Sequence, residues 1–446
     1  MFGNNDSRHF LPHIDIEENR TRRLEHLGGL VESAVAGGIE RAGLEAPVLS
    51  PEEDGSLQPQ AGVWYRYPVP EGISGDGSEY HIYIKKGKTD RLVLFFSGGG
   101  VAWNEYTAAR PVTGGRVAAG EPNYYWSNLR PFTQVMNIHI GITENGSRNP
   151  FSDWSFVVIT YATGDLHVGD SRCSYCVSED GEDEKGVKEG EDRDLKSVRT
   201  LYFHGRKNAR ASLKIAASLF PSPEKLLVAG DSAGGFAVPA YAGEIMDEWF
   251  PRCPDVTLFS DSSLVPCSDW QRIARDVWKA PDALWQAADG PDLTLDWYRM
   301  FMENLRGQTP GSSREGRNNR KGAAGAKTLR CLYASSTHDY LLSTYYNDIT
   351  NKIYGTDAKI QEAFYHELQE MVHSLRILWK DIPHAFFIND WKNLRRPGGG
   401  TAHTAVREPQ YYLPVKDGAT MAKWLYDAVN GRVYDVGIRL LQDGDQ

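Results

Sequence analysis

The chain has 446 residues, of which 41% are hydrophobic and 11% aromatic, and its formal net charge is −10 at pH 7. This length fits one large domain with insertions or two to three ordinary domains, and it allows a sizeable core. The acidic balance argues against nucleic acid as the main partner. The sequence holds no apolar run of about 18 residues, so we expect no membrane span.

The N-terminal stretch and the cysteines indicate the compartment. Met1 to Arg23 lacks a basic segment followed by an apolar one, so we expect no secretory signal and a cytoplasmic protein. Five cysteines, an odd number, do not form a disulfide framework. Cys173 and Cys176 form a C-x-x-C, but no second pair completes a zinc site, so we expect neither a metal nor a cofactor.

The pattern along the chain predicts three parts. Residues 1–61 form a polar leader, with a helix over 17–42 and then a linker rich in Pro, Gly and acidic residues. Residues 62–432 form the main domain, and residues 433–446 form a tail. The main domain carries an acidic insert at about 178–194, which indicates a solvated segment, and a Gly/Ser/Arg-rich insert at 306–327, which favours disorder.

In the main domain, short apolar runs alternate with helical patterns. This alternation predicts an α/β fold with a mostly parallel central sheet flanked by helices. The expected strands cover residues 63–69, 79–86, 91–96, 154–161, 226–229, 256–260, 329–335 and 384–389. The expected helices cover residues 195–219, 233–249, 361–382 and 418–429.

The stretch from Lys225 to Ala237, KLLVAGDSAGGFA, organises the rest of the chain. A buried strand is expected over Leu226–Ala229, residues 230–234 match G-x-S-x-G, and a helical pattern follows. Small residues permit a sharp turn that holds Ser232 clear of the backbone. The N–H of Ala233 would then point to where negative charge develops during attack on a carbonyl. Taken alone, the stretch fits either a nucleophile elbow or a tightly packed strand-to-helix turn.

A glycine-rich loop follows the strand expected over 91–96. Its three consecutive glycines let backbone N–H groups approach a ligand closely, and Gly99 and Gly100 are the candidate oxyanion donors. A flexible surface loop is the less favoured alternative, because the glycines adjoin the strand directly. Candidates for substrate contact near these loops are Val101, Trp103, Asn104, Asp165, His167 and Phe236.

The loop after the strand at 154–161 contains Asp165, His167 and Asp170. At the carboxyl end of a strand, it should face the same crevice as Ser232. These residue types also fit a metal site, but hydrogen-bonded loop structure or a lining of the substrate pocket is the favoured interpretation. His204, in a polar segment of an expected helix, is disfavoured as a catalyst.

An acid and a histidine follow Ser232 in the chain order Ser, Asp, His that α/β-hydrolases use. Asp339 lies just after the strand at 329–335, and His403 lies in the loop after the last strand. His403 would take the Ser232 proton and return it to the departing alcohol, while Asp339 would orient the imidazole.

Other residues compete for these two roles. Asp261 also lies at a strand end and is the alternative acid. His384 lies inside an apolar strand, which favours a core position, and His338 directly adjoins Asp339, which makes it a poor partner for that acid.

Five motifs occur in a fixed order along the chain: FFSGGGVAWN, NPFSDWSFVVITYATGDLHVGD, YFHGRKNARA, GDSAGGFA and GGGTAHT. Together they resemble the pectin acetylesterase and Notum family of α/β-hydrolases, especially its bacterial branch, over residues 62–432. The resemblance implies an α/β-hydrolase fold and a metal-independent serine esterase. It also implies a triad of Ser232, Asp339 and His403, with Gly99, Gly100 and Ala233 around the oxyanion.

Two features depart from the family pattern. Val101 stands where an aromatic residue commonly follows the glycines, and the many disulfides and signal sequence of secreted plant and animal members are not found. The residues and the resemblance favour removal of O-acetyl groups from a sugar, oligosaccharide or polysaccharide through an acyl-serine intermediate. The alternatives are removal of a longer acyl chain, as in the Notum branch, and an inactive carbohydrate-binding protein of the same fold.

Overall fold

The computed structural model describes residues 37–178, 196–307, 327–394 and 398–442. The expected N-terminal helix lies largely outside these ranges, and its residues 37–41 are helical. The acidic insert and the Gly/Ser/Arg-rich insert also lie outside the described residues, apart from their first or last positions.

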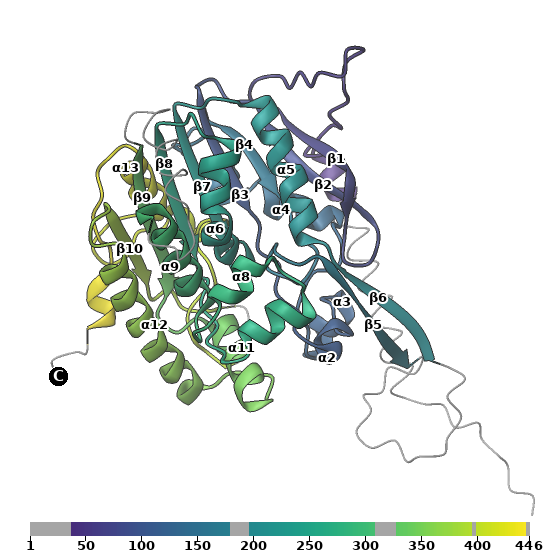
Figure 1. Ribbon diagram of the computed structural model, residues 1–446, viewed down its shortest axis with the longest axis vertical. Helices are drawn as coiled ribbons and strands as arrows, with labels where there is room; N and C mark the ends of the chain where they lie inside the picture. The colour runs from purple at the N-terminus through teal and green to yellow at the C-terminus, as the bar shows by residue number, and fades with distance from the viewer. Residues whose placement is uncertain (1–36, 179–195, 308–326, 395–397, 443–446) are drawn as a thin grey trace, which may run out of the picture.

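A central sheet runs through the molecule (Figure 1). Within the described residues it has eight strands in the order β1, β2, β4, β3, β7, β8, β9, β10. From β4 to β10 in this order neighbouring strands are parallel, whereas β2 is antiparallel to both neighbours, so the predicted mostly parallel sheet is confirmed. The bounds are β1 Trp64–Ile73, β2 Glu79–Lys85, β3 Arg91–Phe96, β4 Ser155–Ile159, β7 Lys225–Asp231, β8 Asp255–Asp261, β9 Thr328–Ser336 and β10 His384–Asn389.

Helices cover both faces of this sheet, which is why its parallel strands are apolar throughout. Side chains alternate along each strand, so Leu94 and Val228 enter the core on one face while Val93 and Leu227 enter the core on the other. The first face is covered by α5 Gly205–Leu219, α6 Ala233–Glu244, α9 Leu293–Arg306 and α12 Ala358–Leu378 (Figure 1). The second face is covered by α4 Pro131–Ile138 and α13 Met421–Val429.

Further helices connect these layers. They are α2 Glu105–Ala108, α3 Gly114–Ala119, α7 Trp270–Arg272, α8 Asp282–Ala287 and α11 Tyr340–Asn351, and a π-helical turn over Ile245–Trp249 extends α6. In Figure 1, α2, α3 and α11 gather at the lower end, where the parallel strands finish. Across the described ranges, no helix combines the length and the hydrophobicity needed to cross a membrane.

The predicted helix over 195–219 is wrong in its first part. Lys196–Phe203 is strand β6, which pairs antiparallel with β5 (Ser171–Ser178) in a separate two-stranded ribbon, and the helix begins only at Gly205. The strand-favouring residues Val198, Thr200 and Tyr202 recur at every second position, which is the period of a strand rather than a helix. The ribbon projects from the body at the lower right of Figure 1.

The described segments on either side of the main domain pack on its core. Val48 bridges to Arg66 in β1, and the next residue, Leu49, is buried. At the other end, Val436 bridges to Phe387 in β10 and is also buried. The described parts of the expected linker and tail therefore belong to the same compact unit.

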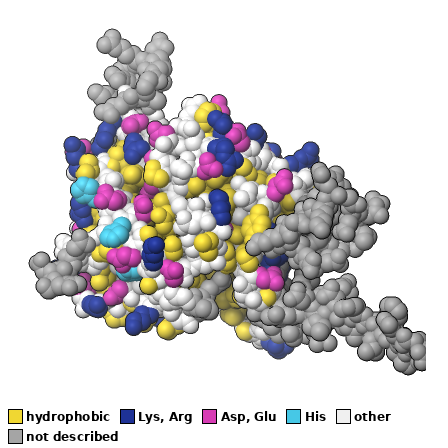
Figure 2. Space-filling view, turned by 90° about the horizontal axis from the view of Figure 1, so that it is seen from below, with side chains coloured by type: hydrophobic (Ala, Val, Ile, Leu, Met, Phe, Trp, Pro, Cys, Tyr) yellow, Lys and Arg dark blue, Asp and Glu magenta, His cyan; other side chains and the backbone are white. Residues whose placement is uncertain are grey.

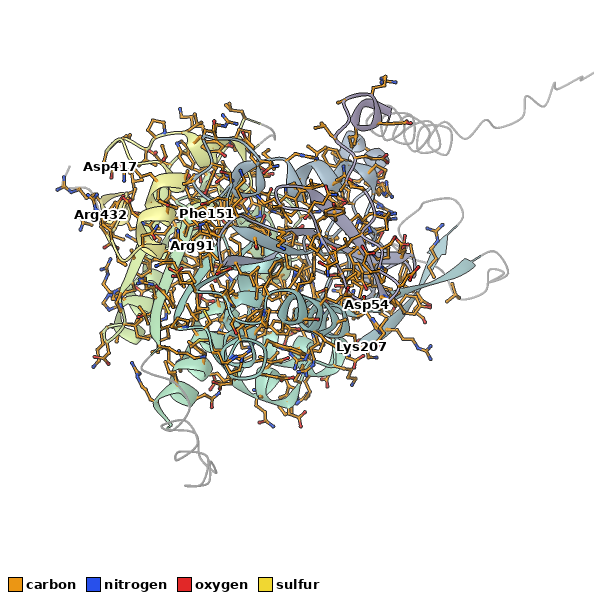
Figure 3. The ribbon with its side chains drawn as sticks, turned by 90° about the horizontal axis from the view of Figure 1, so that it is seen from above. Asp54, Arg91, Phe151, Lys207, Asp417 and Arg432 are labelled. Atoms are coloured by element: carbon orange, nitrogen blue, oxygen red, sulfur yellow. The ribbon has the colours of Figure 1, made fainter. Side chains whose placement is uncertain are left out.

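Trp424 on α13 anchors the second face of the sheet. Its side chain is fully buried, and its ring centroid lies 5.9 Å from that of Phe259 and 5.4 Å from that of Phe387. Its Nε1 donates to the carbonyl oxygen of Tyr434 over 2.7 Å. Figure 3 shows this region from above, with Phe151 lying beside α13.

We expect Trp424→Ala to lower the free energy of unfolding by about 3–5 kcal/mol, because it leaves a cavity against two other rings. Denaturant unfolding followed by circular dichroism measures this change. The neighbouring variant Lys423→Ala is the matched control, since that side chain is 62% exposed; it should change stability by less than about 1 kcal/mol. Equal losses in the two variants would contradict the assignment of Trp424 to the core.

Candidate active site

Four loops that the sequence singles out begin at one edge of the sheet. The glycine loop follows β3, Ser232 follows β7, Asp339 follows β9 and His403 follows β10. These strands are parallel, so their carboxyl ends share an edge. This is the lower end in Figure 1, and Figure 2 views the molecule from that side, where hydrophobic side chains lie among charged ones.

Ser232 lies in a sharp turn between β7 and α6. Its backbone angles, φ 52° and ψ −123°, are seldom adopted by residues with a side chain, so the turn is strained. Close packing maintains this strain: a Cβ on Gly234 would lie 1.9 Å from the carbonyl oxygen of Phe96, at the end of β3. The Ser232 N–H donates to the carbonyl oxygen of Asp261 over 2.8 Å. The predicted strand, turn and helix are therefore confirmed.

The glycine loop runs directly past this turn. The N–H of Gly98 donates to Asp231 Oδ1 over 2.8 Å, and a Cβ on Gly98 would lie 2.8 Å from Ser232 Cβ. Gly100 has φ 84°, and a Cβ there would lie 1.9 Å from the carbonyl oxygen of Tyr124. Only glycine fits at both positions without displacing the backbone of the neighbouring segment.

Three backbone N–H groups beside Ser232 are available to an anion. Among the described residues, none accepts a hydrogen bond from the N–H of Gly99, Gly100 or Ala233. Ala233 is the first residue of α6, so its N–H lies at the positive end of the helix dipole. These are the three donors that the sequence predicts.

The structure brings His403 and Asp339 into direct contact. His403 Nδ1 lies 2.7 Å from Asp339 Oδ2. The other carboxylate oxygen accepts the N–H groups of Leu341 at 2.9 Å and Leu342 at 3.0 Å, at the start of α11. His403 Nε2 is buried and has no hydrogen-bond partner in the described part of the chain, so it is the ring atom left to take a proton. It makes no direct hydrogen bond to Ser232 Oγ, and such bonds are often long without substrate.

Backbone pairing between the two loops fixes this contact. Thr401 bridges to Asp339 in parallel register. The N–H of Thr401 donates to the His338 carbonyl oxygen over 2.9 Å, and the Tyr340 N–H donates to the Thr401 carbonyl oxygen over 3.2 Å. The segment that leads to His403 is thus attached on both sides of Asp339.

The charges around His403 raise its pKa. Burial lowers the pKa of the ring, but the charge and hydrogen bond of Asp339 and the charges of Asp261 and Asp231 outweigh burial. The pKa of His403 therefore lies above its ordinary value of 6.5, and an imidazolium is stabilised at this position.

Asp261, the alternative acid, binds the histidine loop rather than the ring. Its Oδ2 accepts the N–H groups of Ala405 at 2.8 Å and Val406 at 2.9 Å. Burial raises the pKa of Asp261 to about 6, although these two bonds oppose the rise. The geometry therefore pairs His403 with Asp339 and makes Asp261 a support for the residues that follow His403.

Asp165 and His167, expected as substrate contacts, are instead part of a buried loop. Their exposed fractions are 0% and 1%. Asp165 accepts the Thr163 hydroxyl at 2.7 Å and the Gly205 N–H at 2.8 Å. Burial lowers the pKa of His167 to about 4, so the neutral ring donates through Nε2 to the Ser97 carbonyl oxygen over 2.9 Å. His167 thus supports the start of the glycine loop. Of the two roles favoured for this loop, the structure shows hydrogen-bonded loop structure, and neither side chain is exposed to contact substrate.

The other expected substrate contacts have structural partners as well. Val101, Trp103 and Phe236 are buried, with exposed fractions of 4%, 5% and 3%. Asn104 is exposed and caps α2, where its side chain accepts the Thr107 N–H. The prediction that these four side chains contact substrate has no support from their surroundings.

The remaining candidates bind elsewhere. Asp170 forms an ion pair of 2.7 Å with Lys207, which Figure 3 labels near the right edge of the body. His338 Nε2 lies 3.5 Å from Glu362 on α12, and His384 Nδ1 lies 2.8 Å from the Ile382 carbonyl oxygen. In the described ranges, no group of three or more His, Cys, Asp or Glu side chains could hold a metal ion.

Sequence reasoning missed a buried ion pair next to Ser232. Asp231, the residue before Ser232, lies 2.9 Å from Arg407, and the side chains of both are 7% exposed. A signal was available, because an aspartate at the end of a buried strand requires a counter-charge or donors. Arg407 follows a run of small and apolar residues after His403, so it was the candidate for that counter-charge.

No family model matches this chain, and a search of the curated proteins finds no relative.

A cleft of about 300 Å³ opens near the glycine loop. It is lined by aromatic, amide and charged side chains, among them Asp76, Tyr125, Asn128, Arg130, Tyr175 and Arg199. Tyr125 bridges to Gly100, and the next residue, Trp126, donates its N–H to the Gly99 carbonyl oxygen over 2.9 Å. One backbone segment thus separates the cleft from the glycine loop.

We expect Gly234→Ala to unfold the protein or to lower its free energy of unfolding by several kcal/mol, because the new Cβ would meet the Phe96 carbonyl oxygen. Gly243→Ala in the same helix is the matched control. The nearest atom to a Cβ there, on Phe301, is 4.0 Å away, so stability should stay equal or rise by up to about 1 kcal/mol. Thermal unfolding of both variants tests this, and a Gly234→Ala variant as stable as the control would disprove the close approach of β3 and α6.

Proposed function

We propose that this protein is a serine esterase of the α/β-hydrolase fold that removes O-acetyl groups from a sugar, oligosaccharide or polysaccharide. The observation that carries the proposal is the 2.7 Å hydrogen bond between His403 and the buried Asp339, at the sheet edge where Ser232 occupies a strained turn. The mostly parallel sheet and the chain order of these residues support the fold assignment. The ordered motifs that resemble the pectin acetylesterase and Notum family support the reaction class.

In this reaction Ser232 Oγ attacks the carbonyl carbon of the ester while His403 Nε2 takes its proton. The tetrahedral intermediate collapses, the bond between carbonyl carbon and alcohol oxygen breaks, and the imidazolium returns the proton to the departing alcohol. A water molecule, deprotonated by the same Nε2, then attacks the acyl-serine. The bond between the carbonyl carbon and Ser232 Oγ breaks, the imidazolium returns the proton to Oγ, and acetate is released. Asp339 orients the ring and stabilises the imidazolium in both halves of the reaction.

The negative charge that develops on the carbonyl oxygen needs fixed donors. The N–H groups of Ala233, Gly99 and Gly100 suit this role because no described residue accepts from them. Ala233 follows Ser232 in the chain, and Gly99 and Gly100 follow Gly98, which packs against Ser232. Donors of this kind act without reorganisation, since the helix and the bridge to Tyr125 hold their backbone in place.

The cleft beside the glycine loop supports a carbohydrate as the substrate. Its amide and charged side chains are suited to sugar hydroxyls, and the partly exposed ring of Tyr175 is suited to the apolar face of a sugar ring. Tyr125 of its lining bridges to Gly100, so in this proposal a neighbouring sugar unit of the substrate binds in this cleft.

We expect Ser232→Ala to reduce turnover of p-nitrophenyl acetate by at least about 10⁴-fold, because the attacking oxygen is removed. The measurement is p-nitrophenol release from esters of increasing acyl length, together with acetate release from acetylated oligosaccharides, each with a chelator present. Wild type should favour acetyl esters and resist the chelator.

Ser263→Ala is the matched control for this experiment. Ser263 is also buried just after a strand end, and its Oγ has no partner among the described residues, so activity should stay within about threefold of wild type. A loss of less than about tenfold in Ser232→Ala would contradict a serine nucleophile. A steep preference for octanoyl esters would transfer the proposal to longer acyl chains, and no ester cleavage by wild type would favour a binding role.

The pH dependence of kcat/KM tests the role of His403. The base must be neutral, so activity is lost as pH falls through the pKa of His403, which lies above the ordinary 6.5. We therefore expect half-maximal kcat/KM on the acid side at a pH above about 6.5. Asp339→Asn removes the strongest charge that raises this pKa, so its residual activity should persist to lower pH and turnover should fall about 10⁴-fold. An acid limb below about pH 6 in wild type would contradict the assignment.

A further inference from the structure

A buried ion pair involves Asp231, the residue that precedes Ser232 in the chain. Asp231 ends β7, and the guanidinium of Arg407 reaches its carboxylate through Nε at 3.2 Å and Nη2 at 2.9 Å. The two side chains are equally buried, each 7% exposed. This pair joins the residue before Ser232 to the loop that carries His403.

Both partners also bind the glycine loop. Asp231 Oδ1 accepts the N–H of Gly98 over 2.8 Å. Arg407 Nη1 donates to Ser97 Oγ over 3.1 Å and to Asn137 Oδ1, on α4, over 2.7 Å. Two side chains therefore connect the glycine loop, the Ser232 turn and the His403 loop, which come from three separate strands.

The planar fork of arginine is required for this arrangement. Nε and Nη2 of the guanidinium bind the Asp231 carboxylate, while Nη1 points in a different direction and donates to the two neutral oxygens of Ser97 and Asn137. Lysine carries the same charge but is a single point donor, so it can neutralise the carboxylate without reproducing the contacts to Ser97 and Asn137. A buried ion pair is weak evidence for stability in itself, and its best attested use is to fix one arrangement.

We propose that Asp231 and Arg407 are a positioning pair that fixes the proposed oxyanion donors of the glycine loop relative to Ser232 and His403. The inference rests on the proposed esterase function. Neither residue touches the substrate in this proposal. They act through Gly98, which adjoins the donor Gly99, and through the loop that places the base.

The pair also sets the charge near the base. The charged groups around His403 are the carboxylates of Asp339, Asp261 and Asp231, with the guanidinium of Arg407 bound to the last of these. Loss of Arg407 leaves the Asp231 charge uncompensated, whereas loss of the Asp231 charge removes one of the groups that favour an imidazolium. The two changes therefore act on His403 in opposite directions.

The experiment compares Arg407→Gln, Arg407→Lys and Asp231→Asn with wild type, using p-nitrophenyl acetate and the concentration of active sites titrated with a fluorophosphonate. We expect kcat per titrated site to fall about 10- to 100-fold in Arg407→Gln, with KM within about threefold, because displaced donors affect the transition state more than substrate binding. Arg407→Lys should recover thermal stability but not kcat. A kcat per titrated site within about threefold of wild type in Arg407→Gln would overturn the proposal.

The pH profile gives a readout that a purely structural role would not change. The acid limb of kcat/KM should move to higher pH in Arg407→Gln and to lower pH in Asp231→Asn. Limbs that shift in the same direction in both variants would overturn the electrostatic part of the proposal.

Arg330→Gln is the matched control. Arg330 is another arginine with little exposure. It pairs with Asp255 near the amino-terminal ends of β8 and β9, whereas the candidate site lies at their carboxyl ends. Its loss should lower the unfolding temperature but leave kcat and both pH limbs as in wild type. Equal kcat losses in Arg330→Gln and Arg407→Gln would show general destabilisation and overturn the positioning role.

Hydrogen exchange separates this proposal from the proposed function, because it needs no turnover. Peptides covering residues 97–103 and 401–408 should both exchange faster in Arg407→Gln than in Arg330→Gln. Unchanged exchange in either peptide would overturn the positioning role even in an active esterase. Faster exchange in both peptides, in a protein whose wild type cleaves no ester, would support the link between the loops and reject the proposed function alone.

Discussion

A buried carboxylate needs donors or a counter-charge around it, and this requirement shapes the carboxyl edge of the sheet. Four buried aspartates lie at strand ends or in the loops that follow: Asp165, Asp231, Asp261 and Asp339. Each binds a donor from a segment far away in the sequence, namely the N–H groups of Gly205, Gly98 and Ala405 and the ring of His403, respectively. The loops converge because the carboxyl ends of parallel strands share an edge. The hydrogen bonds of these carboxylates then join particular loops to one another.

The four carboxylates differ in function because their partners differ. Only Asp339 binds a titratable ring, so it alone among them acts directly on a proton in the proposed reaction. Asp261 binds both the Ser232 turn and the loop that carries His403. Its carbonyl oxygen accepts the Ser232 N–H, and its carboxylate accepts the N–H of Ala405. Chemical type and position at a strand end are the same for Asp261 and Asp339, which is why either could be the acid until the partner of His403 is known.

The sequence predicts much of this fold because its evidence there is local. Continuous apolar runs such as residues 91–96 and the alternating pattern of residues 79–86 predict the strands of the large sheet, and the G-x-S-x-G turn needs only the residues next to Ser232. Asp339 and His403 also follow from their strand ends and their chain order. What stays hidden depends on long-range contacts: no local pattern shows that Asp165 accepts the Gly205 N–H, or that His167 supports Ser97 instead of facing substrate. Strand β6 was missed because a helical pattern directly follows it.

The proposed reaction needs a positive charge on His403 and a negative charge near Ser232, and nearby carboxylates affect the two in opposite ways. In the proposed reaction the base becomes an imidazolium, a state that nearby carboxylates stabilise, and His403 has three carboxylates around it. An oxyanion formed at Ser232 is disfavoured by the same charges, above all by Asp231, the adjacent residue in the chain. The buried Arg407 neutralises that carboxylate, while the N–H of Gly98 donates to its Oδ1. In the proposed reaction, the ion pair would let a base surrounded by negative charge act beside an oxyanion that is shielded from the charge of Asp231.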